Sequence, residues 1–491
     1  MSGYRLARGG VVDRARPLAW RFDGRGHVGL AGDTLGSAML AAGLTTVARG
    51  FKYHRPRGVM TAGVEETGAL VTLHRGARRE ANAKAPAVEL VEGLEAFGQN
   101  AWPSVAFDLG RVNDLLGRFF AAGFYYKTFF GVTGRGTAEW MTFEWVIRRA
   151  AGMGRAADPA EVGDGGHESY DVVHDHCDVA VVGAGPAGLA AAEAAAAAGL
   201  DTVLIEQDFE TGGSLIGRGD AVEGQGAADW LAARRAALAS AGVRVLVRTT
   251  AFGLYDTNVL GHYQRAAGEH ATPEGPRGAL RILRPARVIL ATGALERPIV
   301  CGDNDRPGVM LAGAVERYAN RFAVAPGSQA VIATAEDAAY DTALALAGAG
   351  VEVTLADARR APSAHREAAE AAGVSVMQGY VPVAVRGLNA VRGVALGRVP
   401  GGGLDAGHGA QSRAVEADVE RIVEADCLAT SAGWSPAIHL VAHRGVKPAW
   451  DAVRGAFRAA LRDEDLPPGL ALAGAADARS DTAAAVADGR Y

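Results

Sequence analysis

From Cys177 onward, short runs of apolar residues alternate with longer segments of helical periodicity. The segment "CDVAVVGAG" predicts a buried strand and "DTVLIE" a second one, and the helix between them, over 187–198, ends at Gly199. "ARVILATGA" predicts a further strand, and residues 329–359 repeat the order strand, turn, helix and strand. This alternation is typical of a doubly wound sheet, so the pattern predicts an α/β fold with a Rossmann-like core.

The beginning of the chain has a different pattern. Residues 4–30 alternate apolar and polar positions around the Asp-Gly pair at 23–24, which is typical of a hairpin turn. "GDTLGSAMLAAGL" then predicts a short amphipathic helix with Asp33 or Thr34 as its N-cap and Gly43 at its end. Because "GALVTLHRG" follows as a strand, we expect a small α+β domain here.

These patterns divide the chain into four parts. Residues 1–95 form the α+β domain, and the aromatic-rich residues 96–175 form a connecting arm that packs on a neighbouring domain or partner. The dinucleotide-binding domain takes residues 176–328 and 400–491. A second Rossmann-like domain takes residues 329–399.

Composition narrows the function classes. The 491 residues are 49% hydrophobic and 21% charged with a net charge of −5, which gives no general attraction for nucleic acid or anionic lipid. The charged N-terminus has no apolar leader and the run 186–198 is too short to span a bilayer, so we expect a cytoplasmic protein without membrane contact. The three cysteines stand far apart, which excludes a CxxC dithiol, a zinc site of closely spaced cysteines and a four-cysteine iron–sulfur site.

A glycine motif is the strongest chemical signal. Gly183, Gly185 and Gly188 form G-x-G-x-x-G between a strand and a helix, where they permit a tight turn, close approach of a pyrophosphate, and close helix–strand packing. The helix N-terminus offers unpaired N–H groups to phosphates. Glu206 ends the next strand, where a carboxylate accepts from a ribose 2′-OH and repels a 2′-phosphate. The alternative is that these glycines serve only the turn.

Further candidates lie at the same predicted edge. Gly213 lets backbone pass close to a ligand and Ser214 can hydrogen-bond it, although an ordinary loop would also explain this stretch. "VILATGALERP" and "GLALAGAADARSDTAAAVADGR" resemble the later strands of two-dinucleotide flavoproteins, which implies nucleotide contacts at Gly293, Ala475 and Thr482. In the second Rossmann-like unit, Glu336 and Asp337 stand where a phosphate-binding turn would be, so we expect one bound dinucleotide.

The whole chain resembles the α subunit of heterotetrameric sarcosine oxidase. The segments that carry this resemblance are "GDTLGSAMLAAG", "FKYHRPRG", "NAWPSVAFDLGRVNDLLGRF", "AGFYYKTF", "HCDVAVVGAGPAGLAAA", "GGSL", "DNDRPGVMLAGA" and "SAGWSPAIHL". The resemblance implies a [2Fe–2S] ferredoxin-like N-terminal domain without its cluster, and we expect no iron–sulfur cluster because the matching stretch has no cysteine. The basic loop Lys52–Arg57 is then an anion site, a subunit contact or a solvated turn.

The resemblance also implies cofactors and partners. It implies NAD⁺ that is not consumed in this chain, FAD in a β subunit, covalent FMN at the α/β interface, and small γ and δ subunits. It carries nucleotide contacts to these positions: Ala187, Glu206, Gln207, Ser214, Ala251, Ala475 and Thr482. Gln207 and Asp208 depart from the acidic and basic residues expected there, so the adenosine contacts differ. Because the chain ends at Tyr491, we expect it to lack the aminomethyltransferase-like folate half.

Three functions stay open at this point. The first is an α-type subunit that supports oxidation of sarcosine, or of a related N-alkyl amino acid, by a flavin-bearing partner. The second is an FAD-carrying subunit of an opine- or proline-type dehydrogenase, and the third is a non-catalytic scaffold. No catalytic residue and no metal ligand is assigned, since His54, His262, His365 and His439 stand in unrelated contexts typical of packing or surface positions.

Overall fold

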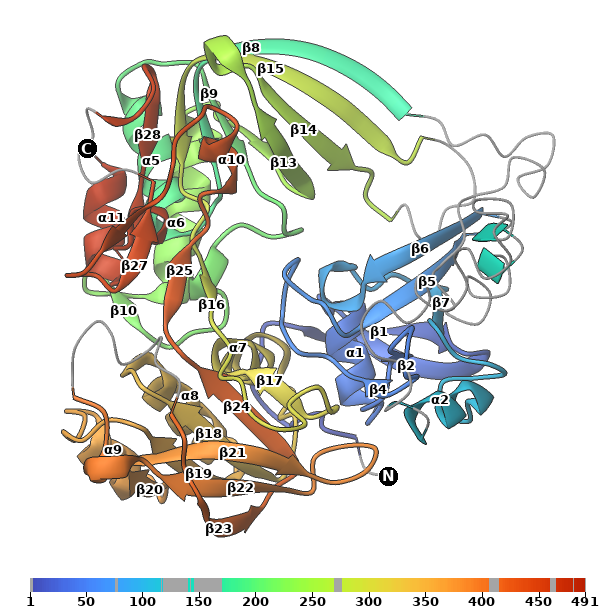
Figure 1. Ribbon diagram of the computed structural model, residues 1–491. Helices are drawn as coiled ribbons and strands as arrows, with labels where there is room; N and C mark the ends of the chain where they lie inside the picture. Colours follow the sequence, from blue (N-terminus) through green and yellow to red (C-terminus); the bar gives the residue numbers. More distant parts are fainter. Residues whose placement is uncertain are drawn as a thin grey trace.

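The computed structural model describes residues 3–75, 78–115, 117, 140–141, 143–144, 170–268, 276–405, 415–459, 465–479 and 481–490. Figure 1 shows an N-terminal domain beside two sheet-bearing units, with helix α7 (Ala312–Phe322) where the three come together. One hydrophobic core joins side chains of the N-terminal domain, of α7 and of the second unit. Most of the arm expected over 96–175, including its aromatic segment, lies outside the described residues.

The N-terminal domain is built on a five-stranded sheet and one short helix. The sheet order is β2 (Arg25–Ala31), β1 (Asp13–Phe22), β7 (Glu95–Gly98), β5 (Leu70–Arg75) and β6 (Arg78–Lys84). Smaller elements are β3 (Ala48–Arg49), β4 (Pro56–Arg57), η1 (Ala85–Ala87), η2 (Leu109–Arg111) and α2 (Val112–Leu115). The expected hairpin joins β1 to β2. Because β7 pairs with β1 and β5, this sheet extends beyond residue 95.

Helix α1 (Leu35–Ala41) begins where the sequence predicts. The Thr34 hydroxyl accepts from the Ser37 N–H, and the Ser37 hydroxyl accepts from the Thr34 N–H, which closes a reciprocal cap. Asp33 supports the same turn by accepting from the Ser37 hydroxyl at 2.7 Å. The apolar face of α1 is buried in the core of the domain.

The first Rossmann unit carries a seven-stranded sheet. Its order is β12 (Arg244–Leu246), β9 (Thr202–Ile205), β8 (Tyr170–Val182), β15 (Gly278–Leu290), β14 (Leu260–Arg265) and β13 (Thr249–Leu254), with β28 (Leu470–Leu472) beside β15. Strands β12, β9, β8, β15 and β28 run parallel, as the sequence pattern predicts. Strand β8 begins at Tyr170, within the range expected for the arm.

Helices and short elements complete this unit. They are α5 (Pro186–Ala197), α6 (Ala227–Ser240), α10 (His439–Ala442), α11 (Thr482–Gly489), η5 (Gly213–Leu215), η6 (Asp256–Asn258), η10 (Gly474–Asp477), β10 (Ala221–Val222), β11 (Gln225–Gly226), β26 (Ala449–Asp451) and β27 (Ala456–Arg458). Among the described residues, none of the helices has the length and apolar character needed to cross a membrane.

The second unit has a parallel sheet and an antiparallel one. The parallel order is β17 (Val309–Leu311), β24 (Cys427–Ser431), β18 (Gln329–Thr334), β19 (Glu352–Asp357) and β20 (Ser375–Gln378); the antiparallel order is β21 (Tyr380–Arg386), β22 (Gly393–Arg398) and β23 (Val419–Glu424). Helices α8 (Ala338–Gly348), α9 (Arg366–Ala371) and η7 (Pro400–Gly402) belong here. Strands β17 and β24 come from outside the range 329–399 expected for this unit. Strands β16 (Ala294–Glu296) and β25 (Trp434–Pro436) pair with each other and connect the two units (Figure 1).

Candidate functional site

The glycine turn lies at the carboxyl edge of the first sheet. Backbone hydrogen bonds tie it there, since Gly183 N–H donates to the Ile205 carbonyl and Ala291 N–H donates to the Val182 carbonyl, both at 2.8 Å. The ends of β8, β9 and β15 therefore meet at this turn. In open parallel sheets, nucleotides bind in the crevice outside the carboxyl ends of the strands.

A side chain would meet a different steric environment at each glycine of the motif. Gly183 has φ +102°, and a Cβ there would lie 2.3 Å from the Ala291 carbonyl oxygen. A Cβ on Gly188 would lie 1.8 Å from the Gly183 carbonyl oxygen, so this glycine permits the close helix–strand packing. At Gly185 the nearest atom to a Cβ is 4.0 Å away. A Cβ at Gly185 would therefore meet no clash and would only reach van der Waals contact with Gly213.

The N-terminus of α5 is suited to bind an anion. Its N-cap is Gly185 and makes no side-chain cap, and Pro186 follows in the first turn. The first N–H groups of such a helix and its dipole favour negative charge. Both η10 and α11 pack closely against the first turn of α5, because a Cβ on Gly474 in η10 would lie 2.7 Å from Ala187 Cβ and one on Gly489 in α11 would lie 2.2 Å from the Ala187 carbonyl oxygen.

Glu206 is buried beside the glycine turn. One carboxylate oxygen accepts from Ala184 N–H at 2.7 Å and the other accepts from Asp208 N–H at 2.9 Å. Burial raises the pKa of Glu206, while the two backbone hydrogen bonds act to lower it. A carboxylate has about four lone-pair positions, so both oxygens keep capacity for a ribose hydroxyl.

The loop after Glu206 crosses the glycine turn. Gly212 N–H donates to the Ala184 carbonyl at 2.8 Å, and a Cβ on Gly213 would lie 2.8 Å from Gly185 Cα. Ser214, in η5, is exposed, as is Gln207 directly after Glu206. The backbone of this loop therefore forms one wall of the candidate site.

Asp208 has arginine partners that the sequence pattern did not reveal. Its carboxylate accepts from Arg321 at 2.6 and 2.9 Å and from Arg317 at 2.7 Å, both on α7. Burial alone would raise the pKa of Asp208, but the hydrogen bonds and charges of the two arginines outweigh it and lower the pKa. The i, i+4 spacing of these arginines was the available signal that they share one helix face.

The remaining predicted residues lie around the same edge. Gly293 follows β15 with φ +75° and accepts from Ala437 N–H at 3.0 Å. Ala475 lies in η10, directly after β28, and Thr482 is the first residue of α11, which Asp481 caps through Ala484 N–H. Ala251 lies two residues beyond Thr249, whose N–H donates to the Glu206 carbonyl at 2.8 Å. The chain therefore brings these segments toward one region.

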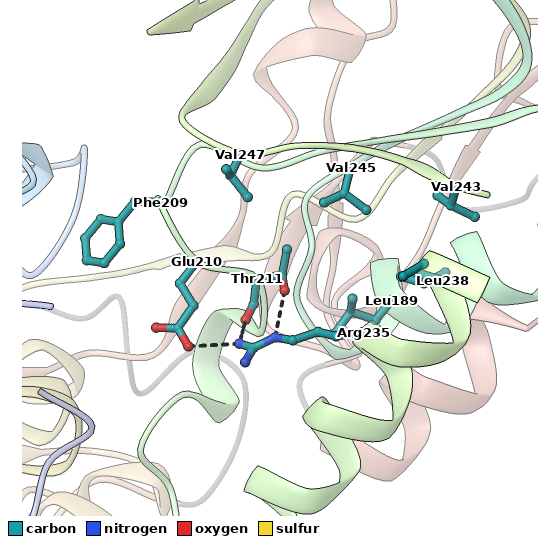
Figure 2. A pocket seen from close by; sticks show the side chains of 10 residues that line it. Leu189, Phe209, Glu210, Thr211, Arg235, Leu238, Val243, Val245 and Val247 are labelled. Carbon is teal, nitrogen blue, oxygen red and sulfur yellow. Dashed lines mark hydrogen bonds and ion pairs between the residues drawn. The ribbon is translucent and has the colours of Figure 1, made fainter. Parts of the chain in front are cut away.

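A cavity of about 570 Å³ lies between α5, α6 and the loop after Glu206. Its apolar wall includes Leu189, Leu238 and Val245. Figure 2 shows Arg235 reaching from α6 to Glu210 and Thr211, with 3.0 Å between Arg235 Nη2 and Glu210 and 3.0 Å between Arg235 Nε and the Thr211 hydroxyl. Arg235 thus holds the loop to α6.

In the corresponding region of the second unit, acidic side chains pair with residues of the same unit. Asp357, at the end of β19, accepts from Arg359 at 2.7 Å and from the Tyr340 hydroxyl at 2.9 Å. Asp337 accepts from Arg359 at 2.8 Å, and the Ser431 hydroxyl donates to Glu336. These contacts leave acidic side chains where an incoming phosphate would lie.

The polar candidates of the basic loop have local partners, and the remaining histidines and cysteines stand apart from the glycine turn. In the basic loop, Arg57 binds Asp305 at 2.6 Å and Arg55 binds Asp114 at 2.7 Å, while His54 lies 2.8 Å from Asp108. His262 is buried, which lowers its pKa to about 4, and His365 and His439 are exposed. The three cysteines are free thiols, and burial raises the pKa of Cys177 and Cys427 to about 12.

Comparisons with known proteins agree with this architecture. Residues 177–453, more than half of the chain, match the family model described as pyridine nucleotide-disulphide oxidoreductase. The solved structure of L-proline dehydrogenase from P. horikoshii aligns with a TM-score of 0.65 at 17% identity, covering 100% of this chain and 74% of that one. At this identity the structural likeness shows the fold alone.

Two relatives are similar over nearly the whole chain. Sarcosine oxidase subunit alpha from Rhizobium meliloti (strain 1021) is 43% identical over 100% of this chain and 46% of its own length. The subunit of the same name from Corynebacterium sp. (strain P-1) is 36% identical over 97% of this chain and 43% of its own length. The resemblance predicted from the sequence is confirmed, and the chain spans less than half the length of these relatives.

One expectation about cofactors is corrected. Residues 15–101 match the model described as a 2Fe-2S iron-sulfur cluster binding domain, which contradicts the expectation of no iron–sulfur cluster. That expectation depended on the lack of cysteine, and residues 15–101 indeed contain none. A cluster held by this domain would need ligands from other residue types or from elsewhere, as histidine serves in some [2Fe–2S] centres.

The glycine turn, the parallel sheet and the matched family model lead to one assignment. The chain belongs to the pyridine nucleotide-disulphide oxidoreductase family, and over its full length it is similar to sarcosine oxidase subunit alpha.

Proposed function

We propose that this chain is an α-type subunit of a sarcosine-oxidase-like complex and that it holds NAD⁺ at the glycine turn of the first unit. The observation that carries this proposal is that the Glu206 carboxylate and the start of α5, which has no side-chain cap, lie together at the glycine turn. The similarity to sarcosine oxidase subunit alpha over the whole chain supports the choice of complex.

The residues of the chain have separate roles in this proposal. The N–H groups at the start of α5 bind the pyrophosphate, and the backbone of Gly212 and Gly213 closes over it. Glu206 accepts from the ribose 2′-hydroxyl and disfavours a 2′-phosphate through charge repulsion. The backbone near Ala251 and the start of α11 border the rest of the nucleotide.

The proposed reaction takes place with a flavin-bearing β subunit. Sarcosine, O₂ and water give glycine, formaldehyde and hydrogen peroxide, and the formaldehyde carbon passes to tetrahydrofolate where a folate-binding part is present. This chain contributes binding and assembly, which agrees with the local partners found for His54, Arg55 and Arg57 in its basic loop. We propose that small γ and δ subunits complete the complex and that it works in the cytoplasm.

The nucleotide released from the purified chain tests the proposal. The full chain is purified without added nucleotide and denatured, and the supernatant is separated by chromatography and read by absorbance. NAD⁺ is the expected product. FAD would instead support an FAD-carrying dehydrogenase subunit, and a chain that neither releases nor rebinds a dinucleotide would be a scaffold.

Co-purification with a flavin-bearing β subunit tests the second half of the proposal. The chain is co-expressed with the β subunit of a sarcosine oxidase, and peroxide formation from sarcosine is measured for the complex and for each part. We expect activity only when both are present. Amine oxidation by the isolated chain would contradict the proposal that the β subunit carries out the oxidation.

A further inference from the structure

We propose that Asp208 is a positioning residue that couples occupancy of the nucleotide site to docking of the N-terminal domain. Asp208 follows Glu206 by two residues, and its N–H donates to the Glu206 carboxylate at 2.9 Å. If Glu206 moves toward a ribose, this hydrogen bond therefore shifts the backbone of Asp208 as well. This inference rests on the proposed nucleotide site, and its test separates the two.

The first connection runs through the carboxylate of Asp208. Arg321, which is 1% exposed, binds both of its oxygens, so the position of the guanidinium is fixed by Asp208. The carbonyl of Arg321 accepts from Val11 N–H at 2.8 Å, and the carbonyl of the next residue, Phe322, accepts from Arg5 at 2.6 Å. The start of the chain is thereby held against the end of α7.

This connection continues into the N-terminal domain. Leu6 N–H donates to the Ala323 carbonyl at 2.8 Å, and Ala325 N–H donates to the Tyr4 carbonyl at 3.0 Å, so the first residues run beside the segment after α7. Arg5 binds both oxygens of Asp33, at 2.5 and 3.1 Å. Asp33 is buried at the start of α1, where it also accepts from the Ser37 hydroxyl.

The second connection runs through the carbonyl of Asp208. Arg248 N–H donates to this carbonyl at 2.8 Å, and the Arg248 guanidinium binds both oxygens of Glu89 at 2.6 and 2.8 Å. Glu89 pairs by its backbone with Thr34, the N-cap of α1, and Leu90 N–H donates to the Asp33 carbonyl at 2.9 Å.

Both connections therefore end at Asp33 and Thr34, at the beginning of α1. Planar, bidentate arginine–carboxylate pairs transmit position better than single contacts because they fix orientation as well as distance. A ligand that orders Glu206 and Asp208 then orders both connections at once. The expected result is tighter docking of the N-terminal domain in the nucleotide-bound state.

The test uses the full chain and three variants: Asp208→Asn, Arg248→Gln and the control Arg277→Gln. Arg277 pairs with Glu80 across the same interface and belongs to neither of the two connections. Amide hydrogen exchange is followed over residues 5–14 and 33–41, with and without NAD⁺, and the NAD⁺ affinity is measured by calorimetry.

We expect saturating NAD⁺ to slow exchange in these segments by about fivefold or more in the unchanged chain, in the range of typical coupling between sites. Asp208→Asn should accelerate exchange without nucleotide and abolish the NAD⁺-dependent slowing, and Arg248→Gln should reduce that slowing. Arg277→Gln should also accelerate exchange, but saturating NAD⁺ should still slow it. If Asp208 only stabilised the interface, Asp208→Asn and Arg277→Gln would respond to NAD⁺ in the same way.

Two outcomes separate the proposals. If Asp208→Asn and Arg248→Gln both leave nucleotide-free exchange unchanged, the coupling is wrong, whatever NAD⁺ does. If the unchanged chain does not bind NAD⁺ but both variants accelerate exchange at residues 33–41, the physical link to α1 is supported and the proposed function fails.

Discussion

The carboxylate of Glu206 accepts a hydrogen bond from Ala184 N–H at 2.7 Å, so the acid that ends the second strand is bound to the glycine turn itself. A second hydrogen bond, from Asp208 N–H, holds the other oxygen at 2.9 Å. Glu206 thus organises the turn and the following loop.

Replacing Glu206 tests this double role. We expect Glu206→Gln to weaken NAD⁺ binding by about 1–3 kcal/mol, the usual range for a hydrogen bond to a charged group. Glu206→Ala should lose more, because it leaves both the Ala184 and the Asp208 N–H groups without an acceptor, whereas the amide oxygen of Gln still serves one of them. Calorimetry of the purified chain measures both losses.

The control for these variants is Glu352→Gln, which changes an exposed acid at the start of β19 in the second unit. Its NAD⁺ affinity should equal that of the unchanged chain. Unchanged affinity in Glu206→Gln as well would show that the ribose is held by other groups.

Alanine substitutions at Gly185 and Gly188, the N-cap and the third residue of α5, should have different effects. At Gly185 a methyl group has 4.0 Å of space and the backbone has ordinary negative φ, so Gly185→Ala should fold normally and lose nucleotide affinity. At Gly188 the methyl group would lie 1.8 Å from a carbonyl oxygen, so overpacking should cost about 1–3 kcal/mol or more of stability.

Chemical unfolding and calorimetry on the same two variants separate these effects. Wild-type stability together with lost binding is expected only for Gly185→Ala. If Gly185→Ala binds NAD⁺ as tightly as the unchanged chain, the pyrophosphate does not approach this turn.

The glycine turn and its helix could be predicted because their reasons are local. The spacing of Gly183, Gly185 and Gly188 follows from backbone sterics over six residues, and Thr34 caps α1 through a residue three positions away. The role of Asp208 could not be predicted in the same way. Its partner Arg321 lies 113 residues later, and nothing in the local pattern around either residue indicates that α7 packs against this loop.

The extent of the sheets was also set by distant pairing. Strand β7 joins the N-terminal sheet by pairing in parallel with β1, and β24 enters the second sheet beside β18, although each lies far along the chain from its neighbour. Sequence periodicity predicts that such segments are strands. It does not specify which sheet they complete.

Stability should depend on pH through Glu296, on the connector between the two units. Burial raises its pKa to about 8, and the nearby Glu336 and Glu316 also raise it, while hydrogen bonds from Ser431 and Gly313 act to lower it. Between the ordinary pKa of a glutamate and about pH 8, Glu296 therefore keeps its proton in the folded state and has lost it in the unfolded state. Stability from this group is therefore present at low pH and is lost as pH rises toward about 8.

The comparison of the unchanged chain with Glu296→Gln isolates this contribution. The free energy of unfolding of the unchanged chain should fall relative to the variant by about 1.4 kcal/mol per pH unit between about pH 5 and pH 8. Chemical unfolding at several pH values measures the difference. A difference that stays constant over this interval would mean that Glu296 is ionised in the folded protein.

Each chain should bind a single dinucleotide. Calorimetry with NAD⁺ should give one site, because in the second unit Asp357 is already bound by Arg359 and Tyr340, and Glu336 and Asp337 oppose a phosphate. Gly185→Ala should then remove all measurable binding. Two equivalents bound by the unchanged chain, one of which persists in Gly185→Ala, would reveal a second site and would contradict the expectation that the second unit binds no nucleotide.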